Sequence, residues 1–172
     1  MKWLMIALGG IVVLIALAAV IGMTLPKGHV ATHEVRLTQP PDSVWAVITD
    51  FAQQPEWSEL VESSARIGDI NGHPAWRENY GGFTVDMETS EWDPPRRLVR
   101  VVHAGNAGFR GSWTWELAPD GAGTRLVITE RGEVDNPIFR LMGRLMDQSA
   151  TARKYGEALE RRLAGQAAVR GG

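Results

Sequence analysis

The feature that most constrains this chain is an uninterrupted apolar segment near its start. Residues 3–25 carry no charge and consist of Leu, Ile, Val, Ala, Met and Gly, with one Trp at the beginning and one Thr near the end. A helix rises about 1.5 Å per residue, so this segment would span the roughly 30 Å apolar core of a bilayer. Trp3 falls where an interfacial aromatic residue is expected, and Pro26 would end the helix. The sequence therefore predicts a transmembrane helix, with residues 1–27 as a membrane anchor.

A cleaved signal peptide is the competing interpretation of this segment. Residues 16–18, Ala-Leu-Ala, have the small-x-small pattern of a cleavage site. The apolar run is longer than the about 7–15 residues of a signal-peptide core, which favours an uncleaved anchor. Lys2 and Lys27 flank the run, so the positive-inside count is nearly balanced. The short leading segment favours a single-pass membrane protein whose domain lies on the extracytoplasmic side.

The charge and the residue types exclude several classes of function. The formal net charge is -2, with 20 acidic and 18 basic side chains, whereas a nucleic-acid-binding domain needs a basic face. There is no cysteine, which excludes disulfides, thiolate metal sites and a cysteine nucleophile. His29 and His33 are four residues apart but belong to a link and a strand, not to a metal-binding helix. We expect no metal, no cofactor and no nucleic-acid partner, and we assign no catalytic residue.

Residues 28–165 have the patterning of one α+β domain, and residues 166–172 form a small polar tail. Residues 30–38 alternate between polar and apolar side chains and predict a strand, after which Pro41 would open a short helix. Short links between the following strands favour an antiparallel sheet with one apolar face. Period-two alternation predicts these strands at residues 64–68, 75–80, 83–88, 98–102, 112–117 and 124–133.

The last part of the domain has helical periodicity. Asp135 or Asn136 would cap a helix whose first turn contains Pro137. Apolar residues then recur at steps of three, four or seven, which places them on one helical face. The pattern predicts one long C-terminal helix that covers the sheet, with the following buried residues: Ile138, Met142, Leu145, Ala152, Tyr155, Leu159 and Leu163.

Four segments in this order resemble the START-like helix-grip (SRPBCC) superfamily, in its polyketide cyclase/dehydrase and lipid transport branch. They are Pro-Pro-Asp-Ser-Val-Trp at 40–45, the Asp-Phe…Trp segment at 49–57, Trp-Asp-Pro-Pro-Arg-Arg-Leu at 92–98, and the hairpin from Trp-Thr-Trp-Glu-Leu at 113–117 to Gly-Thr-Arg-Leu at 123–126. The resemblance implies a helix-grip fold, a curved antiparallel sheet of about seven strands around the long C-terminal helix. It also implies an apolar cavity between sheet and helix.

The candidate ligand-binding residues are large apolar side chains on elements that would face this cavity. Core filling is the alternative role for each of them. Glu130 shares the phase of Leu126 and Ile128 and is a candidate polar group at the cavity mouth; the alternative is a solvated charge at a strand end. The cavity candidates are Trp76, Tyr80, Phe83, Val85, Met87, Trp113, Trp115, Phe139, Met142 and Met146.

These expectations favour a membrane-anchored binder or carrier of an apolar, lipid-like small molecule. Two other functions stay open at this point. One is a cyclase or dehydratase that uses the same cavity, which would need inward polar groups within hydrogen-bond reach of the ligand. The other is an interaction module of the cell envelope, whose cavity would be small or closed. The oligomeric state is left open.

Overall fold

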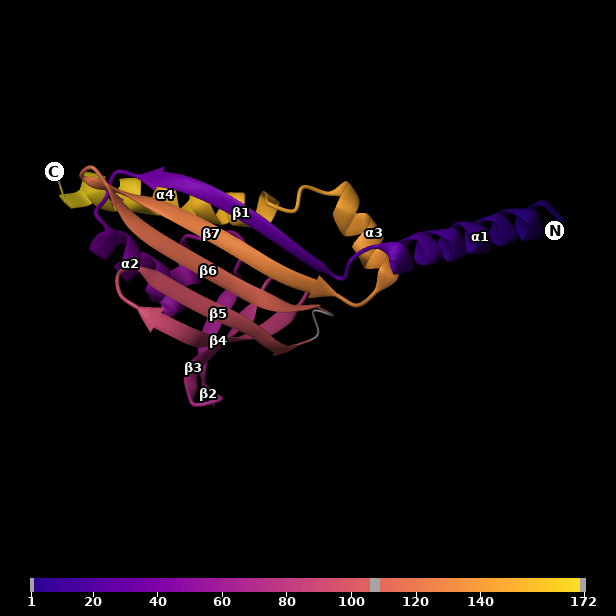
Figure 1. Cartoon of the computed structure of the whole chain (residues 1–172), viewed down its shortest axis with the longest axis horizontal. Helices are drawn as coiled ribbons and strands as arrows, with labels where there is room; N and C mark the ends of the chain where they lie inside the picture. Colours follow the sequence, from indigo (N-terminus) through magenta and orange to yellow (C-terminus); the bar gives the residue numbers. More distant parts are fainter. Residues whose placement is uncertain (1, 106–108, 171–172) are drawn as a thin grey trace.

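A computed structural model describes residues 2–105 and 109–170 and shows an α+β domain from which one helix projects (Figure 1). This helix, α1 (Lys2–Thr24), is exposed along most of its length, and Gly22 near its end is buried. Within the described residues it is the one helix long and apolar enough to cross a membrane, with a mean hydropathy of 3.0. A signal sequence can have the same properties. The predicted helix is therefore confirmed, and its role as an anchor stays a prediction.

Seven strands form one antiparallel sheet in the order β1-β7-β6-β5-β4-β3-β2, which confirms the predicted sheet. The first strand pairs along its whole length with the last, so strands from opposite ends of the sheet sequence lie side by side. One register shift in the β2–β3 pairing and two in the β4–β5 pairing bend the sheet, because an extra residue in one strand increases its local twist. The strands are β1 (Gly28–Leu37), β2 (Ser63–Ile70), β3 (His73–Asn79), β4 (Thr84–Asp93), β5 (Arg97–Gly105), β6 (Phe109–Asp120) and β7 (Gly123–Val134).

Two short helical segments connect β1 to β2, and the first of them is the helix predicted at Pro41. Helix α2 (Pro41–Thr49) begins at a proline, whose missing N–H would be unpaired in a first helical turn in any case. The apolar side of α2 is buried against the sheet. The 3₁₀ segment η1 (Phe51–Glu56) follows directly, and Phe51 joins the same core.

Helix α4 (Ala150–Arg170) lies in the concave face of the sheet and completes the grip (Figure 1). Tyr155 and Leu159 lie on its buried face together with Ala152 and Leu163. These residues pack on inward side chains of the strands, including Trp115 of β6. The predicted apolar stripe is thus confirmed from Ala152 onward.

The prediction of a single long C-terminal helix is wrong. A separate helix, α3 (Pro137–Leu145), precedes α4, and Met146 between them is extended (φ −103°, ψ 157°). The carboxylate of Asp147 accepts hydrogen bonds from the backbone N–H and the hydroxyl of Ser149 at 2.9 and 2.7 Å. A side-chain acceptor at this place stabilises a helix start, so a new helix begins here. Leu145, predicted to be buried, is 81% exposed.

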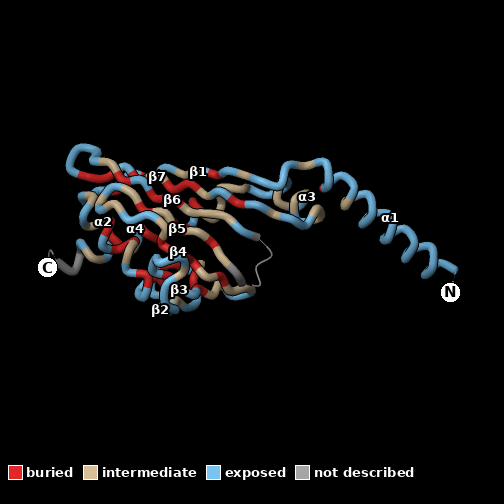
Figure 2. Tube along the Cα trace, turned by 60° about the horizontal axis from the view of Figure 1, so that its bottom comes forward, coloured by how far each residue is buried: buried red, intermediate tan, exposed pale blue. Residues whose placement is uncertain are grey.

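The buried residues are concentrated where the strands face α2 and α4, whereas α1 is largely exposed and α3 is a mixture of intermediate and exposed residues (Figure 2). The main core consists of inward side chains of β1, β5, β6 and β7 that pack against α2 and α4. A smaller apolar cluster of Val85, Met87 and Val102 lies on β4 and β5, and Tyr80, Phe83 and Trp113 pack against it. This second cluster forms the wall of the cavity described next.

Candidate functional site

A cavity of about 270 Å³ lies inside the grip, between the inner face of β4–β7 and the start of α4. This volume is close to the lower end of the roughly 300–1,000 Å³ of small-molecule pockets. Most lining groups are apolar or aromatic, and His29, Tyr80 and Glu130 are the ionisable ones. The lining residues are His29, Tyr80, Phe83, Val85, Met87, Val102, Trp113, Glu130, Gly132, Val134 and Thr151.

The aromatic wall of the cavity is built by a tight turn between β3 and β4. The backbone N–H of Tyr80 donates to the carbonyl of Phe83 at 2.9 Å, and Gly81 supplies the positive φ of 80° that the turn needs. The two rings stack with centroids 5.3 Å apart and planes 7° apart. Val85 and Met87 follow at a spacing of two, so both side chains point to the same, inner face of β4.

Six of the eleven sequence candidates line this cavity: Tyr80, Phe83, Val85, Met87, Trp113 and Glu130. The structure places two others in the core. Trp76 packs edge-on against Phe51, with ring centroids 5.7 Å apart, and Trp115 is buried against Tyr155 at 5.7 Å.

The remaining three candidates, Phe139, Met142 and Met146, lie outside the cavity. Phe139 and Met142 are on α3 and Met146 follows it, and all three side chains are exposed. One continuous helix would have placed them over the sheet. The helix is interrupted after Leu145, however, and α3 packs against α1 instead. Their predicted place in the cavity is wrong for this reason.

Glu130 is the polar group of the cavity, and it comes from the inner face of β7. Its Oε1 lies 3.5 Å from Nε2 of His29 on β1, and its buried Oε2 has no hydrogen-bond partner among the described residues. Burial raises the pKa of Glu130 above its usual value, and the neighbouring His29 partly offsets this effect. The carboxyl group is therefore available to a hydrogen-bonding group of a ligand.

Gly132 makes room for the His29 ring at this wall of the cavity. A Cβ on Gly132 would lie 2.2 Å from Cε1 of His29, which is far closer than atoms can approach. The imidazole therefore lies over bare backbone of β7, near Glu130.

A buried ion pair lies deeper in the grip, next to the cavity. Nη1 of Arg100 on β5 donates to Oε1 of Glu78 on β3 at 2.5 Å, and both side chains are almost fully buried. The hydroxyl of Tyr80 donates to Oε2 of Glu78 at 2.7 Å, and the Arg100 guanidinium lies 3.9 Å from the centre of the Phe51 ring. Burial, and then the Glu78 carboxylate, raise the pKa of Tyr80 well above its usual value, so this phenol stays a donor.

This network leaves polar atoms facing a second, smaller void. Nε and Nη2 of Arg100 have no hydrogen-bond partner among the described residues. The void beside them measures about 20 Å³ and is also bordered by Tyr80, Met87 and Trp113, which line the main cavity. One water molecule fits a space of that size. Tyr80 thus connects the apolar cavity to the buried ion pair.

The buried pair of Glu78 and Arg100 was not predicted from the sequence. A signal for Arg100 was present, because it alternates with Leu98 and Val102 and so shares their inward face. A charge between two inward apolar residues needs a buried partner, and Glu78 is the one it has.

The cavity suits the binding of an apolar molecule, and the Glu130 carboxyl group suits proton transfer to or from such a molecule. Within residues 2–105 and 109–170, no group of His, Asp and Glu has the geometry to hold a metal ion. Glu130 can accept or, when protonated, donate a hydrogen bond to a bound molecule, while the aromatic wall supplies apolar contact.

A curved antiparallel sheet that grips a C-terminal helix over an apolar cavity defines the START-like helix-grip class of proteins. The sequence profile of the polyketide cyclase / dehydrase and lipid transport family matches residues 29–164. The chain therefore belongs to that family. The family indicates binding of hydrophobic small molecules, and the fold alone does not choose among its activities.

The proteins similar to this chain include a cyclase/dehydratase and several solved structures. The granaticin polyketide synthase bifunctional cyclase/dehydratase of Streptomyces violaceoruber is 26% identical over 86% of this chain, which spans 44% of the length of that protein. A START superfamily protein from Mycobacterium smegmatis matches with a TM-score of 0.65 and 17% identity, covering 80% of this chain and 99% of its own. A protein from Thermus thermophilus has a TM-score of 0.64, 24% identity and the same coverage. The two structures support the fold alone.

Proposed function

We propose that this protein is a membrane-anchored binder of an apolar small molecule that carries a hydrogen-bonding group. The observation that carries the proposal is the 270 Å³ cavity, with its aromatic wall and the unpartnered Oε2 of Glu130. A buried acceptor without a partner is costly, and a ligand hydroxyl or amine would satisfy it. The stacked rings of Tyr80 and Phe83 and the indole of Trp113 would contact the apolar part of the ligand.

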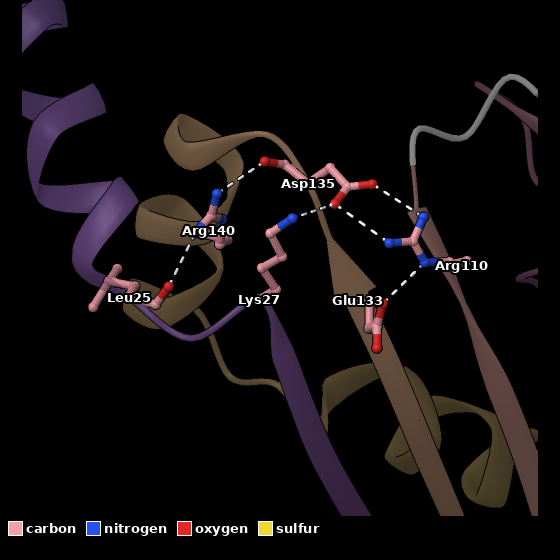
Figure 3. A network of polar contacts seen from close by, with 6 residues as sticks. All are labelled: Leu25, Lys27, Arg110, Glu133, Asp135 and Arg140. Carbon is pink, nitrogen blue, oxygen red and sulfur yellow. Dashed lines mark hydrogen bonds and ion pairs between the residues drawn. The ribbon is translucent and has the colours of Figure 1, made fainter.

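The end of α1 is joined to the domain by polar contacts. Nη1 of Arg140 donates to the carbonyl of Leu25 at 3.0 Å, and Nζ of Lys27 donates to Asp135 at 3.2 Å (Figure 3). Asp135 also pairs with Arg110 at the start of β6. Leu25 and Lys27 both lie after the candidate cleavage site at residues 16–18, so these contacts exist with a retained or a cleaved helix. The length of the apolar run at residues 3–25 is what supports the anchor.

A ligand screen tests the binding proposal. Full-length protein in lipid nanodiscs is titrated with fatty acids, quinone analogues and sterols, and thermal stability and tryptophan emission are recorded. A ligand should raise the melting temperature by mass action and change the emission of Trp113. The Trp113→Phe variant should bind a hit more weakly by about 1–3 kcal/mol if the indole is an anchor contact. Trp92→Phe is the matched control, because Trp92 is half exposed and contacts Trp45 outside the cavity lining.

A cyclase or dehydratase that uses the same cavity is the second candidate. Glu130 and the Glu78–Arg100–Tyr80 network favour it, because they place acid–base groups beside the apolar space. Mass spectrometry of the ligand extracted after incubation separates the two functions. A binder returns the compound unchanged, and an enzyme returns a product. If no apolar compound changes either signal, both proposals fail and the interaction module is left.

A further inference from the structure

Helix α3 exposes an apolar face that the domain does not cover. The side chain of Asn136 accepts hydrogen bonds from the backbone N–H groups of Ile138 and Phe139 at 2.9 and 3.3 Å, so the helix has a defined start. Four large apolar side chains then follow, three along the helix at a spacing of three and one directly after it. Their exposed fractions are 58% for Phe139, 52% for Met142, 81% for Leu145 and 69% for Met146.

The same helix packs on the last turns of α1. A Cβ on Gly22 would lie 1.9 Å from the carbonyl oxygen of Pro137, so the two backbones touch and only glycine fits. Arg140 joins α3 to the carbonyl of Leu25, where the apolar run of α1 ends (Figure 3). Helix α3 therefore lies beside the C-terminal end of the apolar run.

We propose that α3 is an interfacial helix that inserts Phe139, Met142, Leu145 and Met146 between the headgroups and acyl chains of the bilayer. The proposal rests on the anchoring of α1, because the contact between the two helices brings α3 to the surface of the membrane that α1 spans. A helix with one strongly apolar face is the kind that lies in this boundary region.

The charged side chains around α3 favour binding to the lipid surface through insertion of apolar side chains. Lys27 and Arg110 both pair with Asp135, and Arg140 donates to the backbone carbonyls of Leu25 and Asp135. Lys27 and Arg110 are thus paired with an acid, the guanidinium of Arg140 is held by backbone carbonyls, and Arg144 is the exposed cation of α3 closest to its apolar end. Insertion of the apolar side chains, rather than attraction to anionic lipids, would provide most of the binding.

The position of α3 also determines where the cavity opens. Val134 at the end of β7 and Thr151 at the start of α4 both line the cavity, and α3 belongs to the segment that joins them. His29, just after the anchor, lines it as well. With α3 in the headgroup region, this side of the cavity would face the bilayer, so an apolar ligand could enter from the membrane.

The absence of cysteine allows a direct test by site-specific labelling. Single variants Leu145→Cys, Leu14→Cys and Ile67→Cys are labelled with the fluorophore NBD, and each full-length protein is reconstituted into phosphatidylcholine vesicles with lipids brominated near the headgroup or near the chain ends. At Leu145 we expect blue-shifted NBD emission. Bromine near the headgroup should quench this emission more strongly than bromine near the chain ends. The Leu14 label, in the middle of α1, should be quenched by bromine near the chain ends, and the Ile67 label on β2 should not be quenched.

The three labels distinguish failure of this inference from failure of the anchor. An unquenched Leu145 label beside a quenched Leu14 label would overturn the interfacial helix and leave the anchor intact. Absence of quenching at Leu14 would overturn both. Blue-shifted but unquenched emission at Leu145 would mean that a second protein covers α3, which also contradicts the proposal.

Discussion

Leu145 and Leu159 belong to the same apolar repeat in the sequence but lie in opposite environments. Leu159 is fully buried between α4 and the sheet, whereas Leu145 at the end of α3 is 81% exposed. Residue type and periodicity are the same for both, so only the tertiary structure separates them. The difference has a direct consequence for stability.

We expect Leu145→Asp and Leu159→Asp to differ sharply in their effect on folding. The first places a charge on the surface and should change the free energy of unfolding by at most about 0.5 kcal/mol. The second buries an unpaired carboxylate and should remove most of a domain stability of about 5–15 kcal/mol. Thermal denaturation of both variants in detergent provides the measurement. A large loss with Leu145→Asp would show that α3 is part of the core.

The cavity residues were predictable where strand alternation applies and unpredictable elsewhere. Val85 and Met87 are two residues apart, and Trp113 lies on the apolar face of its strand, so their inward direction follows from the pattern. Trp115 shares that face, yet it lies over Tyr155 in the core. Whether an inward residue borders open space or another side chain depends on packing across the sheet, which no local pattern contains.

At the scale of elements, the strands and α2 follow from local patterns, and the break between α3 and α4 does not. Leu145 and Ala152 are seven residues apart, close to two helical turns, so the apolar phase is the same with or without an interruption. The structural cause of the break is polar: Asp147 accepts hydrogen bonds from Ser149 and from Arg153 at 2.6 Å. An Asp-x-Ser sequence inside a helical pattern was the available signal.

The role of Asp147 can be measured through pH. Hydrogen bonds from the Ser149 hydroxyl, and next those from Arg153 and the Ser149 backbone, lower the pKa of Asp147 from its usual 3.8 to about 2. A lowered pKa in the folded state stabilises the fold above pH 3.8, and this stabilisation is lost as the pH falls toward 2. Asp147→Ala should therefore melt below the wild type at neutral pH.

The difference in melting temperature should narrow as the pH falls from about 4 toward 2, because protonation removes the acceptor in the wild type. Asp69→Ala serves as a control, because Asp69 is also an aspartate that pairs with an arginine, Arg66. It lies near the β2–β3 turn and not at the start of α4. If the two melting temperatures differ by the same amount over this pH range, the Asp147 carboxylate is not the cause. The helix propensity of alanine would then explain the effect of the substitution.

At the scale of the whole molecule, a short link that contacts the domain joins α1 to β1. Residues 25–27 alone separate α1 from β1, and both ends of this link make polar contacts to the domain (Figure 3). The sequence predicted the apolar helix from its length. It could not predict that α3 would pack against it, because that contact depends on the break after Leu145.

Fractionation of cells that express the full-length protein tests the anchor itself. The apolar run of 3–25 should keep the protein in the membrane pellet after an alkaline carbonate wash, because charge-based attachment is lost at that pH. The mature N-terminus should lie before Trp3. Release by the wash, or a mature N-terminus near Ala19, would establish a cleaved signal peptide.

The three-residue link also limits how far the domain can travel. Fully extended, three residues span about 10 Å, and the contacts of Lys27 and Arg140 keep the link from extending freely. With α1 as the proposed anchor, a bound ligand would stay within molecular contact of one bilayer. A protein anchored in this way would exchange its ligand with the membrane beside it or with a visiting partner, and would not carry the ligand across an aqueous compartment to a second membrane.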